Sequence, residues 1–214
     1  MSRFFNRLFL TGALFAIAGI ILFGIAFRNF FCMLSPAVNL YEVEDWSSLK
    51  KGDHIRTEVD FLWDYFYYTY DTETGTDEAR AYMISNILPE GDDIVVKEHL
   101  GVMVSDNGDF NKYENLVRTS SEWWMDTTGN VPFPTNTITV EGYLRKLKAD
   151  EREYLVEYIM EDWNLSESQA EEYVCPYMIV PYEMSDSLTI IVMAGICFVV
   201  GLILAALGFF VGSR

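Results

Sequence analysis

Two long runs without a charged residue are the strongest pattern of hydrophobic and polar positions in this chain. Residues 8–27 and 188–211 contain 20 and 24 positions, and nearly all of them are apolar. An α-helix rises about 1.5 Å per residue, so each run is long enough to cross the roughly 30 Å hydrocarbon core of a bilayer. Soluble cores rarely contain such long uninterrupted apolar runs. The pattern therefore predicts two transmembrane helices.

The first run also has to be compared with a signal peptide, because Arg3 and Arg7 precede it. The apolar stretch is longer than the usual hydrophobic region of a signal peptide, and residues 28–31 offer no small-residue cleavage site. Cys32 follows two phenylalanines, whereas a lipoprotein signal has small residues there. We therefore expect an uncleaved anchor.

Basic residues near the ends of the two spans predict their orientation. Arg3, Arg7 and Arg214 lie at the chain ends. In the segment between the two spans, only Arg28 lies close to a span. We expect a multi-pass protein of the cell membrane with both termini in the cytoplasm. The expected order is a cytoplasmic N-terminus (1–7), the first span (8–27), a connector (28–51), an extracytoplasmic α+β domain (52–183), the second span (188–211) and a cytoplasmic C-terminus (212–214).

The hydrophobic pattern changes between the spans. Stretches with the two-residue alternation of β-strands are interspersed with stretches that have the spacing of α-helices. In residues 54–70 apolar and aromatic side chains alternate with polar ones, which predicts one long half-buried strand that can bend or bulge. Residues 71–77 have the composition of a turn. Further strands are expected at 79–88, 94–98 and 135–147, an edge strand at 177–182, and helices at 110–117, 150–163 and 166–174. Ser35-Pro36 is expected to break the first helix, and Ser166 and Gln169 fit a capping box at the start of the last one.

These elements predict an α+β fold: a small, mainly antiparallel sheet or barrel-like domain with two or three helices, flanked by two transmembrane helices. The order of hairpins and crossing segment resembles that of an oligonucleotide-binding-type barrel. Such a fold would leave the function open.

Charge narrows the choice of partners. All 32 acidic residues but only 11 of the 15 basic ones lie in residues 29–187, which gives this segment a net charge of −21. Nucleic acids and anionic lipid surfaces need clustered Lys and Arg, so both are excluded as partners. An acidic surface keeps a domain dissolved, and it also fits adaptation to high salt. Basic proteins and divalent cations are the partners it would accept.

No motif for catalysis or for a cofactor is present, so no catalytic residue and no cofactor is predicted. A hydrolase with paired carboxylates stays open, because some of the 32 acids must lie close together. Asp71, Glu73 and Asp77 alternate in a flexible turn, which is a weak candidate for a calcium site. The same residue types also suit a plain hairpin turn. Core or membrane-interface packing is expected for Trp63, Tyr65, Tyr67, Tyr68, Trp123 and Trp124, with an aromatic platform for a glycan or peptide as the alternative.

Cysteines and small residues suggest two structural contacts. Cys32 and Cys175 both lie near a span on the outer side and could form a disulfide. Small residues in the second span share one helical face, which favours close packing with the first span or with a second copy of the chain. The packing residues expected in the second span are Gly201, Ala205, Gly208 and Gly212, and those in the first are Gly12, Ala16 and Gly19.

The stretches Gly52-Asp-His-Ile and Thr137-Ile-Thr-Val-Glu-Gly-Tyr-Leu, with the layout of spans, resemble uncharacterised bacterial two-span membrane proteins with a β-rich extracytoplasmic domain. This resemblance implies no activity. We expect a non-enzymatic, membrane-anchored module that binds or organises another envelope protein. The alternatives are an envelope glycan or peptide hydrolase with paired carboxylates and a domain that responds to divalent cations.

Overall fold

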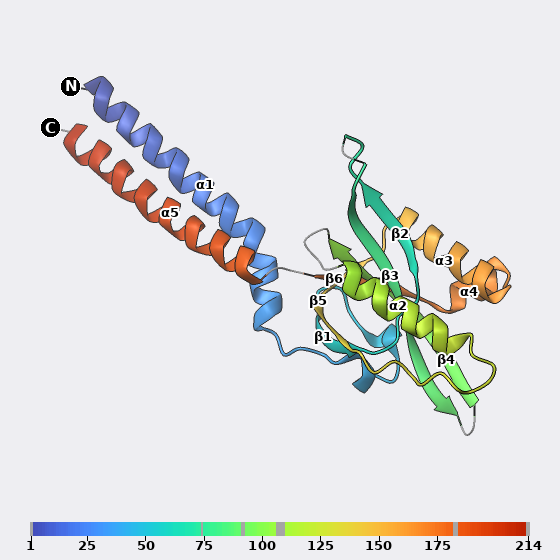
Figure 1. Ribbon diagram of the computed structural model, residues 1–214. Helices are drawn as coiled ribbons and strands as arrows, with labels where there is room; N and C mark the ends of the chain where they lie inside the picture. The colour runs from blue at the N-terminus through green and yellow to red at the C-terminus, as the bar shows by residue number, and fades with distance from the viewer. Residues whose placement is uncertain (1, 74, 91–92, 106–109, 182–183, 213–214) are drawn as a thin grey trace. The chain divides into compact units, whose positions relative to one another are not determined.

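The computed structural model describes residues 2–73, 75–90, 93–105, 110–181 and 184–212 (Figure 1). The chain divides into two compact units. One contains Met1–Leu34 and Tyr182–Arg214, and the other contains Ser35–Pro181. We call them the helix unit and the sheet unit, and each is described by itself.

The helix unit consists of α1 (Ser2–Leu34) and α5 (Met184–Gly212), which run antiparallel side by side (Figure 1). Their segments Arg7–Gly24 and Leu188–Phe210 are long and apolar enough to cross a membrane. Large apolar side chains are exposed along both helices, and such a surface suits lipid rather than water. Helix α1 ends directly before the Ser-Pro pair that was expected to break it.

Small residues bring the two helix backbones together. A β-carbon added at Gly12 would lie 2.3 Å from the backbone nitrogen of Ala205, and one added at Gly201 would lie 2.4 Å from that of Ala16. Two of the four expected packing residues of the second run therefore lie against the first helix. Gly208 is buried, whereas the surroundings of Gly212 lie outside the described residues. Packing between copies of the chain stays a prediction.

The sheet unit is built on six strands in the order β1-β5-β6-β4-β3-β2. Every neighbouring pair is antiparallel except β4 and β6, which run parallel. Strands β1 and β2 lie at opposite edges, so the sheet is open rather than barrel-like, and the prediction of a mainly antiparallel α+β domain is confirmed. The strands are β1 (His54–Val59), β2 (Tyr65–Tyr70), β3 (Asp77–Glu90), β4 (Asp93–Ser105), β5 (Ile138–Lys146) and β6 (Val174–Pro181).

The predicted single strand over residues 54–70 is wrong, because β1 and β2 belong to opposite edges of the sheet. The crossing segment, residues 60–64, lies between them. Phe61, Leu62 and Trp63 are three consecutive buried side chains, and a regular strand buries alternate residues on one face. This break in the alternation of buried and exposed side chains marks the segment that crosses from β1 to β2.

The predicted edge strand near residue 177 is a central strand, because β6 lies between β5 and β4. Prolines are normally confined to edges, bulges and strand ends. Pro176 lies where the pairing with β4 shifts register, between Val174 and Met178, and its carbonyl accepts a hydrogen bond from the backbone N–H of Leu147 at 3.0 Å. Pro181 ends the strand. Both prolines therefore fit a central strand.

Helices cover both faces of the sheet. One hydrophobic core includes Leu116 of α2 (Phe110–Trp124), and the other includes Ile159 of α3 (Ala149–Trp163). Side chains of β3 alternate between them: Tyr82 belongs to the first core and Met83 to the second. The short helix α4 (Glu167–Glu172) begins with the expected capping box. The helices predicted near these positions are confirmed.

Part of the expected connector belongs to the sheet unit. Two short 3-10 helices, η1 (Leu40–Glu42) and η2 (Trp46–Ser48), bury Leu40 and Trp46 completely in the core that contains α2. The indole N–H of Trp46 donates to the carbonyl of Leu40 at 3.1 Å. These apolar residues are separated by acids in the sequence, and for this reason the segment was expected to be a linker.

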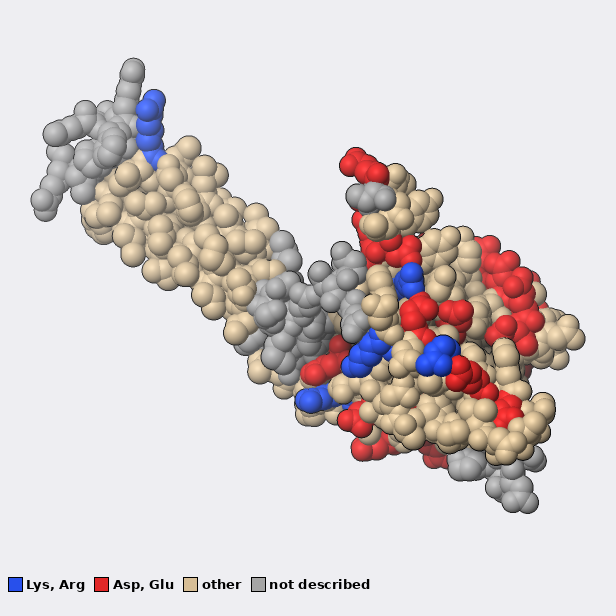
Figure 2. Space-filling view, viewed as in Figure 1, with Lys and Arg blue, Asp and Glu red and all other residues tan. Residues whose placement is uncertain are grey.

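The charge is distributed as the composition indicates. On the face shown in Figure 2, Asp and Glu side chains are spread over the sheet unit, whereas the helix unit is uncharged along most of its length. Such a surface keeps the sheet unit soluble.

The close helix contact gives a first prediction. We expect Gly201→Ala to destabilise the helix pair by about 1–3 kcal/mol, because the new methyl group meets backbone atoms that cannot move aside. The matched control is Gly195→Ala on the same helix, where an added β-carbon meets no atom within 4 Å. Unfolding of the full chain by titration with SDS measures the difference. Equal stability of the two variants would contradict the packing described.

Candidate functional site

An open cleft of about 740 Å³ lies where the end of α2, the crossing segment and the second half of α3 meet. Elements from both faces of the sheet therefore contribute to one site. The cleft is lined by Trp63, Asp64, Ser121, Trp124, Met125, Thr127, Tyr158, Asp162 and Trp163.

Indole rings form the wall of the cleft. Trp63 packs edge-on against Trp124, with ring centroids 5.1 Å apart, and against Trp163 at 6.1 Å. Trp63 is only 9% exposed, whereas Trp124 is 45% exposed. Edge-to-face aromatic pairs contribute about 0.5–1.5 kcal/mol beyond the burial of their area. The wall is therefore a packed structure with one ring open to solvent.

Backbone hydrogen bonds hold the crossing segment in place. The N–H of Leu62 donates to Ser120 Oγ on α2 at 3.0 Å, and the N–H of Trp63 donates to the carbonyl of Met83 on β3 at 2.9 Å. The crossing segment is thus fixed to α2 through Leu62 and to β3 through Trp63. The next side chain along, Asp64, is exposed at the mouth of the cleft.

Two acids give the cleft its charge. Asp64 and Asp162 are both exposed and both line it. Burial, together with these two carboxylates, raises the pKa of the Tyr158 hydroxyl between them. Among the nine described residues that line the cleft, none is basic. The site therefore combines aromatic faces with uncompensated negative charge.

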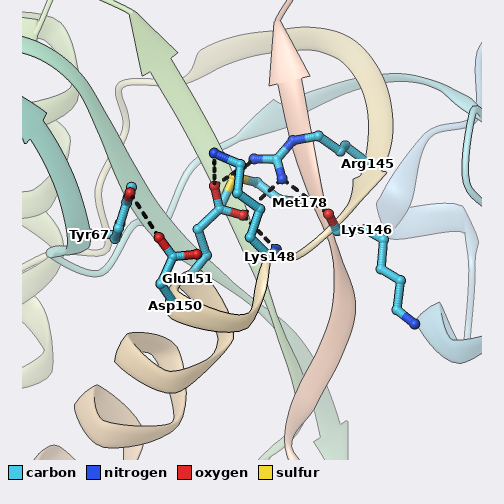
Figure 3. Close-up of polar contacts among 7 residues, drawn as sticks. All are labelled: Tyr67, Arg145, Lys146, Lys148, Asp150, Glu151 and Met178. Atoms are coloured by element: carbon cyan, nitrogen blue, oxygen red, sulfur yellow. Dashed lines mark hydrogen bonds and ion pairs between the residues drawn. The ribbon is translucent and has the colours of Figure 1, made fainter.

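A buried ion pair positions α3, which contributes three of the nine residues that line the cleft (Figure 3). The side chain of Glu151, in the first turn of α3, is 0% exposed and accepts hydrogen bonds from Arg145 Nη1 at 2.8 Å and Nη2 at 2.9 Å. It also accepts the backbone N–H of Lys148 at 2.8 Å, which closes a capping box. The end of β5 is thus fixed to the start of α3.

Opposing effects act on the pKa of Glu151. Burial raises it, but the hydrogen bonds from Arg145 and from the N–H of Lys148 outweigh burial, and the net pKa is lowered. Close by, Tyr67 of β2 donates its hydroxyl to Asp150 at 3.3 Å (Figure 3). The first turn of α3 therefore contacts two different strands.

A buried histidine lies behind the aromatic wall. Ser85 Oγ accepts the indole N–H of Trp63 at 2.7 Å and lies 2.7 Å from His99 Nδ1. The His99 ring packs edge-on against Trp163 at 5.1 Å, and within the described part of the chain its Nε2 has no hydrogen-bond partner. Burial lowers the pKa of His99 to about 4. Ser85 is also buried, so this Ser–His contact supports the wall and is closed to substrate.

The candidate calcium residues have other partners. Asp71 Oδ1 accepts the backbone N–H of Glu73 at 2.7 Å, and Asp77 pairs with Arg80 at 2.6 Å. In the portion of the chain that the structure describes, no group of three His, Cys, Asp or Glu side chains is placed to hold a metal ion. Asp71 therefore caps its own turn, and the calcium site stays a prediction.

The cysteines expected to pair belong to different units. Cys175 is a buried free thiol of the sheet unit, with its Sγ 3.9 Å from the carbonyl of Trp46. Burial raises the pKa of this thiol to about 12, so the nucleophilic thiolate is scarce near neutral pH. The Cys32–Cys175 disulfide stays a prediction.

The structure assembles only part of the candidate aromatic platform. The rings of Trp63, Trp123 and Trp124 each contact Phe61, and Trp124 also contacts the other two. The tyrosines of β2 lie elsewhere, since Tyr65 packs against the core that contains α2 and Tyr67 against the one that contains α3. The sequence analysis missed Tyr158, Asp162 and Trp163 as site residues. Their helical spacing identified a helix, but nothing in it indicated a partner about 100 positions earlier.

The fold and the cleft define an α+β protein that carries two helices long and apolar enough to cross a membrane. The chain belongs to the family described as Domain of unknown function (DUF8577), whose family model matches residues 2–211. Comparisons with curated proteins and with solved structures found no match. The family model covers both units, so the presence of the helix unit and the sheet unit in one chain is a property of the family.

The buried ion pair gives a second prediction. We expect Glu151→Gln to lower the free energy of unfolding by about 3–5 kcal/mol, because Arg145 loses the carboxylate that balances its charge. The control Glu153→Gln replaces an exposed acid of the same helix, and its effect should stay within about 0.5 kcal/mol. Urea unfolding of the full chain in detergent, followed by tryptophan fluorescence, measures both. A loss below about 1 kcal/mol for Glu151→Gln would contradict the assigned role.

His99 gives a third prediction, for the dependence of stability on pH. Its pKa is about 4 in the folded chain and 6.5 when unperturbed, so the unfolded state binds the proton first as the pH falls. The stability from neutral His99 is complete above pH 6.5 and is lost as the pH approaches 4, a change of about 3 kcal/mol.

The measurement is the free energy of unfolding as a function of pH, for the wild type and for His99→Asn. The wild type should lose more stability than the variant between these two pH values. Parallel curves would show that His99 is not kept neutral by the fold. The comparison rests on the slope, so a constant difference in stability between the two proteins does not affect it.

Proposed function

We propose that this protein is a membrane-anchored module that binds another envelope protein through the aromatic cleft. The cleft carries the proposal, because it is an ordered, concave and partly apolar site on an otherwise acidic domain. Interface centres are enriched in Trp, Tyr and Arg and depleted in charge. The indole wall has this composition.

An exposed apolar patch extends from the cleft. Met125 is 76% exposed and lies beside the exposed Trp124. The following loop, residues 127–134, adds Val131 and Phe133, which are 36% and 41% exposed. Contiguous apolar side chains on a soluble surface mark interaction sites more often than single ones do. The patch supports a partner larger than a small molecule.

The basic residues near the helix ends support a location for this domain. They favour a cytoplasmic position for both termini, and the sheet unit would then lie on the extracytoplasmic side of the cell membrane. A partner would then be another membrane or envelope protein. A homo-oligomer through the second helix is an additional prediction, since its exposed surface offers room for a second contact.

The hydrolase alternative has one observation in its favour. Asp64 and Asp162 line the same cleft, as a pair of catalytic carboxylates would. Both are exposed to solvent, whereas a general acid usually needs a drier environment to hold its proton near neutral pH. The binding role therefore has the stronger support, and the hydrolase stays a prediction.

The fourth prediction tests the binding role in intact membranes. Chemical crosslinking of the full chain should recover a partner in stoichiometric amount, and Trp124→Ala should abolish it, because truncating a central aromatic residue of an interface typically costs at least about 2 kcal/mol. The matched control is Tyr70→Ala, which removes an equally exposed ring outside the cleft. It should leave the crosslink unchanged.

Two outcomes would reject the proposal. One is recovery of only the protein itself across independent preparations. The other is a partner whose recovery is equal for the wild type and Trp124→Ala, because such a partner would bind at another surface. Normal membrane levels of both variants show that they fold.

A further inference from the structure

We infer that the cleft binds the side chain of an arginine in a peptide segment of the partner protein. This inference rests on the proposed function and specifies its ligand. The cleft joins three indole rings to two exposed carboxylates, and no basic residue among its described lining residues balances them. The complementary side chain is a cation with a flat apolar surface.

The aromatic wall selects the kind of cation. The faces of indole rings attract cations, and Trp is the strongest of the aromatic side chains in this respect. The ring centroids of Trp124 and Trp163 lie 5.1 Å and 6.1 Å from that of Trp63. A planar guanidinium stacks on such rings and is more weakly hydrated than an ammonium group. Arginine is therefore favoured over lysine.

The two carboxylates of the cleft supply hydrogen-bond acceptors for the guanidinium group. Asp64 follows the wall residue Trp63, and Asp162 precedes the wall residue Trp163. A carboxylate thus lies next to an indole on each of two opposing elements. Guanidinium groups form charge-assisted, often bidentate hydrogen bonds with carboxylates, which ammonium groups cannot match in geometry. This arrangement gives the ligand an orientation as well as an attraction.

Charge complementarity supports a protein rather than a lipid as the source of the cation. Residues 29–187 carry a net charge of −21, which steers basic protein surfaces toward them. The apolar patch of Met125, Val131 and Phe133 lies next to the cleft in the chain and would contact residues beside the arginine. A quaternary ammonium group would use the rings without needing the carboxylate geometry.

The experiment uses the full chain in detergent micelles, labelled with 5-fluorotryptophan and observed by ¹⁹F NMR. The chain has five tryptophans, so each signal can be assigned by one Trp→Phe substitution. The probe is N-acetylarginine amide. Its neutral isostere N-acetylcitrulline amide and tetramethylammonium chloride are the comparison ligands. Trp46, buried in the opposite core, serves as an internal control for the fold.

We expect the arginine probe to shift the signals of Trp63, Trp124 and Trp163 in a saturable way and to leave Trp46 unchanged. The citrulline analogue should bind at least about tenfold more weakly, because it lacks the charge. Asp64→Asn and Asp162→Asn should each weaken arginine binding by about fivefold to tenfold. Glu172→Gln, which changes an exposed acid on α4, should have no effect.

Three results would overturn the inference. They are equal binding of arginine and citrulline probes, tighter binding of tetramethylammonium than of arginine, and no saturable shift at tens of millimolar probe. None of them rejects the proposed function. A partner whose crosslink depends on Trp124 would then still bind at the cleft, through a side chain of different chemistry.

Discussion

The buried carboxylate of Glu151 is the constraint on which the site depends. A charged group without solvent access is tolerated only when other groups satisfy it. Arg145 at the end of β5 and the N–H of Lys148 at the start of α3 satisfy this one. Because the three positions lie within seven residues of sequence, the interaction is local. Its effect is long-range, since it fixes the direction in which α3 leaves the sheet.

The cleft follows from that direction and from one crossing of the chain. Helix α3 covers the face of the sheet opposite α2, and residues near the ends of both helices line the cleft. The crossing segment runs there on its way from β1 to β2 and inserts Trp63 between Trp124 and Trp163. The buried Ser85–His99 contact supports Trp63 from behind. The exposed Trp124 ring and the carboxylates of Asp64 and Asp162 remain accessible to a ligand.

Local patterns in the sequence were sufficient to predict the elements but not their neighbours. The two apolar runs, the helix near Tyr113 and the capping box at Ser166 depend on residues within a few positions, and all were predicted. The central place of β6 depends on pairing with residues more than 30 positions away. The prolines at its ends gave the opposite indication.

The same distinction applies to the site. Trp63 and Trp124 were recognised as candidates because aromatic residues are informative by themselves. Asp64 and Asp162 were two acids among 32, and only the folded chain brings them to one cleft. The composition of the turn at Asp71 fits both a hairpin turn and a calcium site, and only the folded chain shows the hydrogen bond from the backbone N–H of Glu73 to Asp71 Oδ1.

Site-specific photocrosslinking at residue 125 tests the central claim most directly. Met125 lines the cleft and is 76% exposed, so p-benzoylphenylalanine at this position disturbs little packing. After irradiation of intact membranes, the account predicts an adduct with one segment of another membrane or envelope protein, with an arginine beside the labelled residue. Adducts found only on lipid or on this chain itself would contradict the claim that the cleft is a protein-binding site.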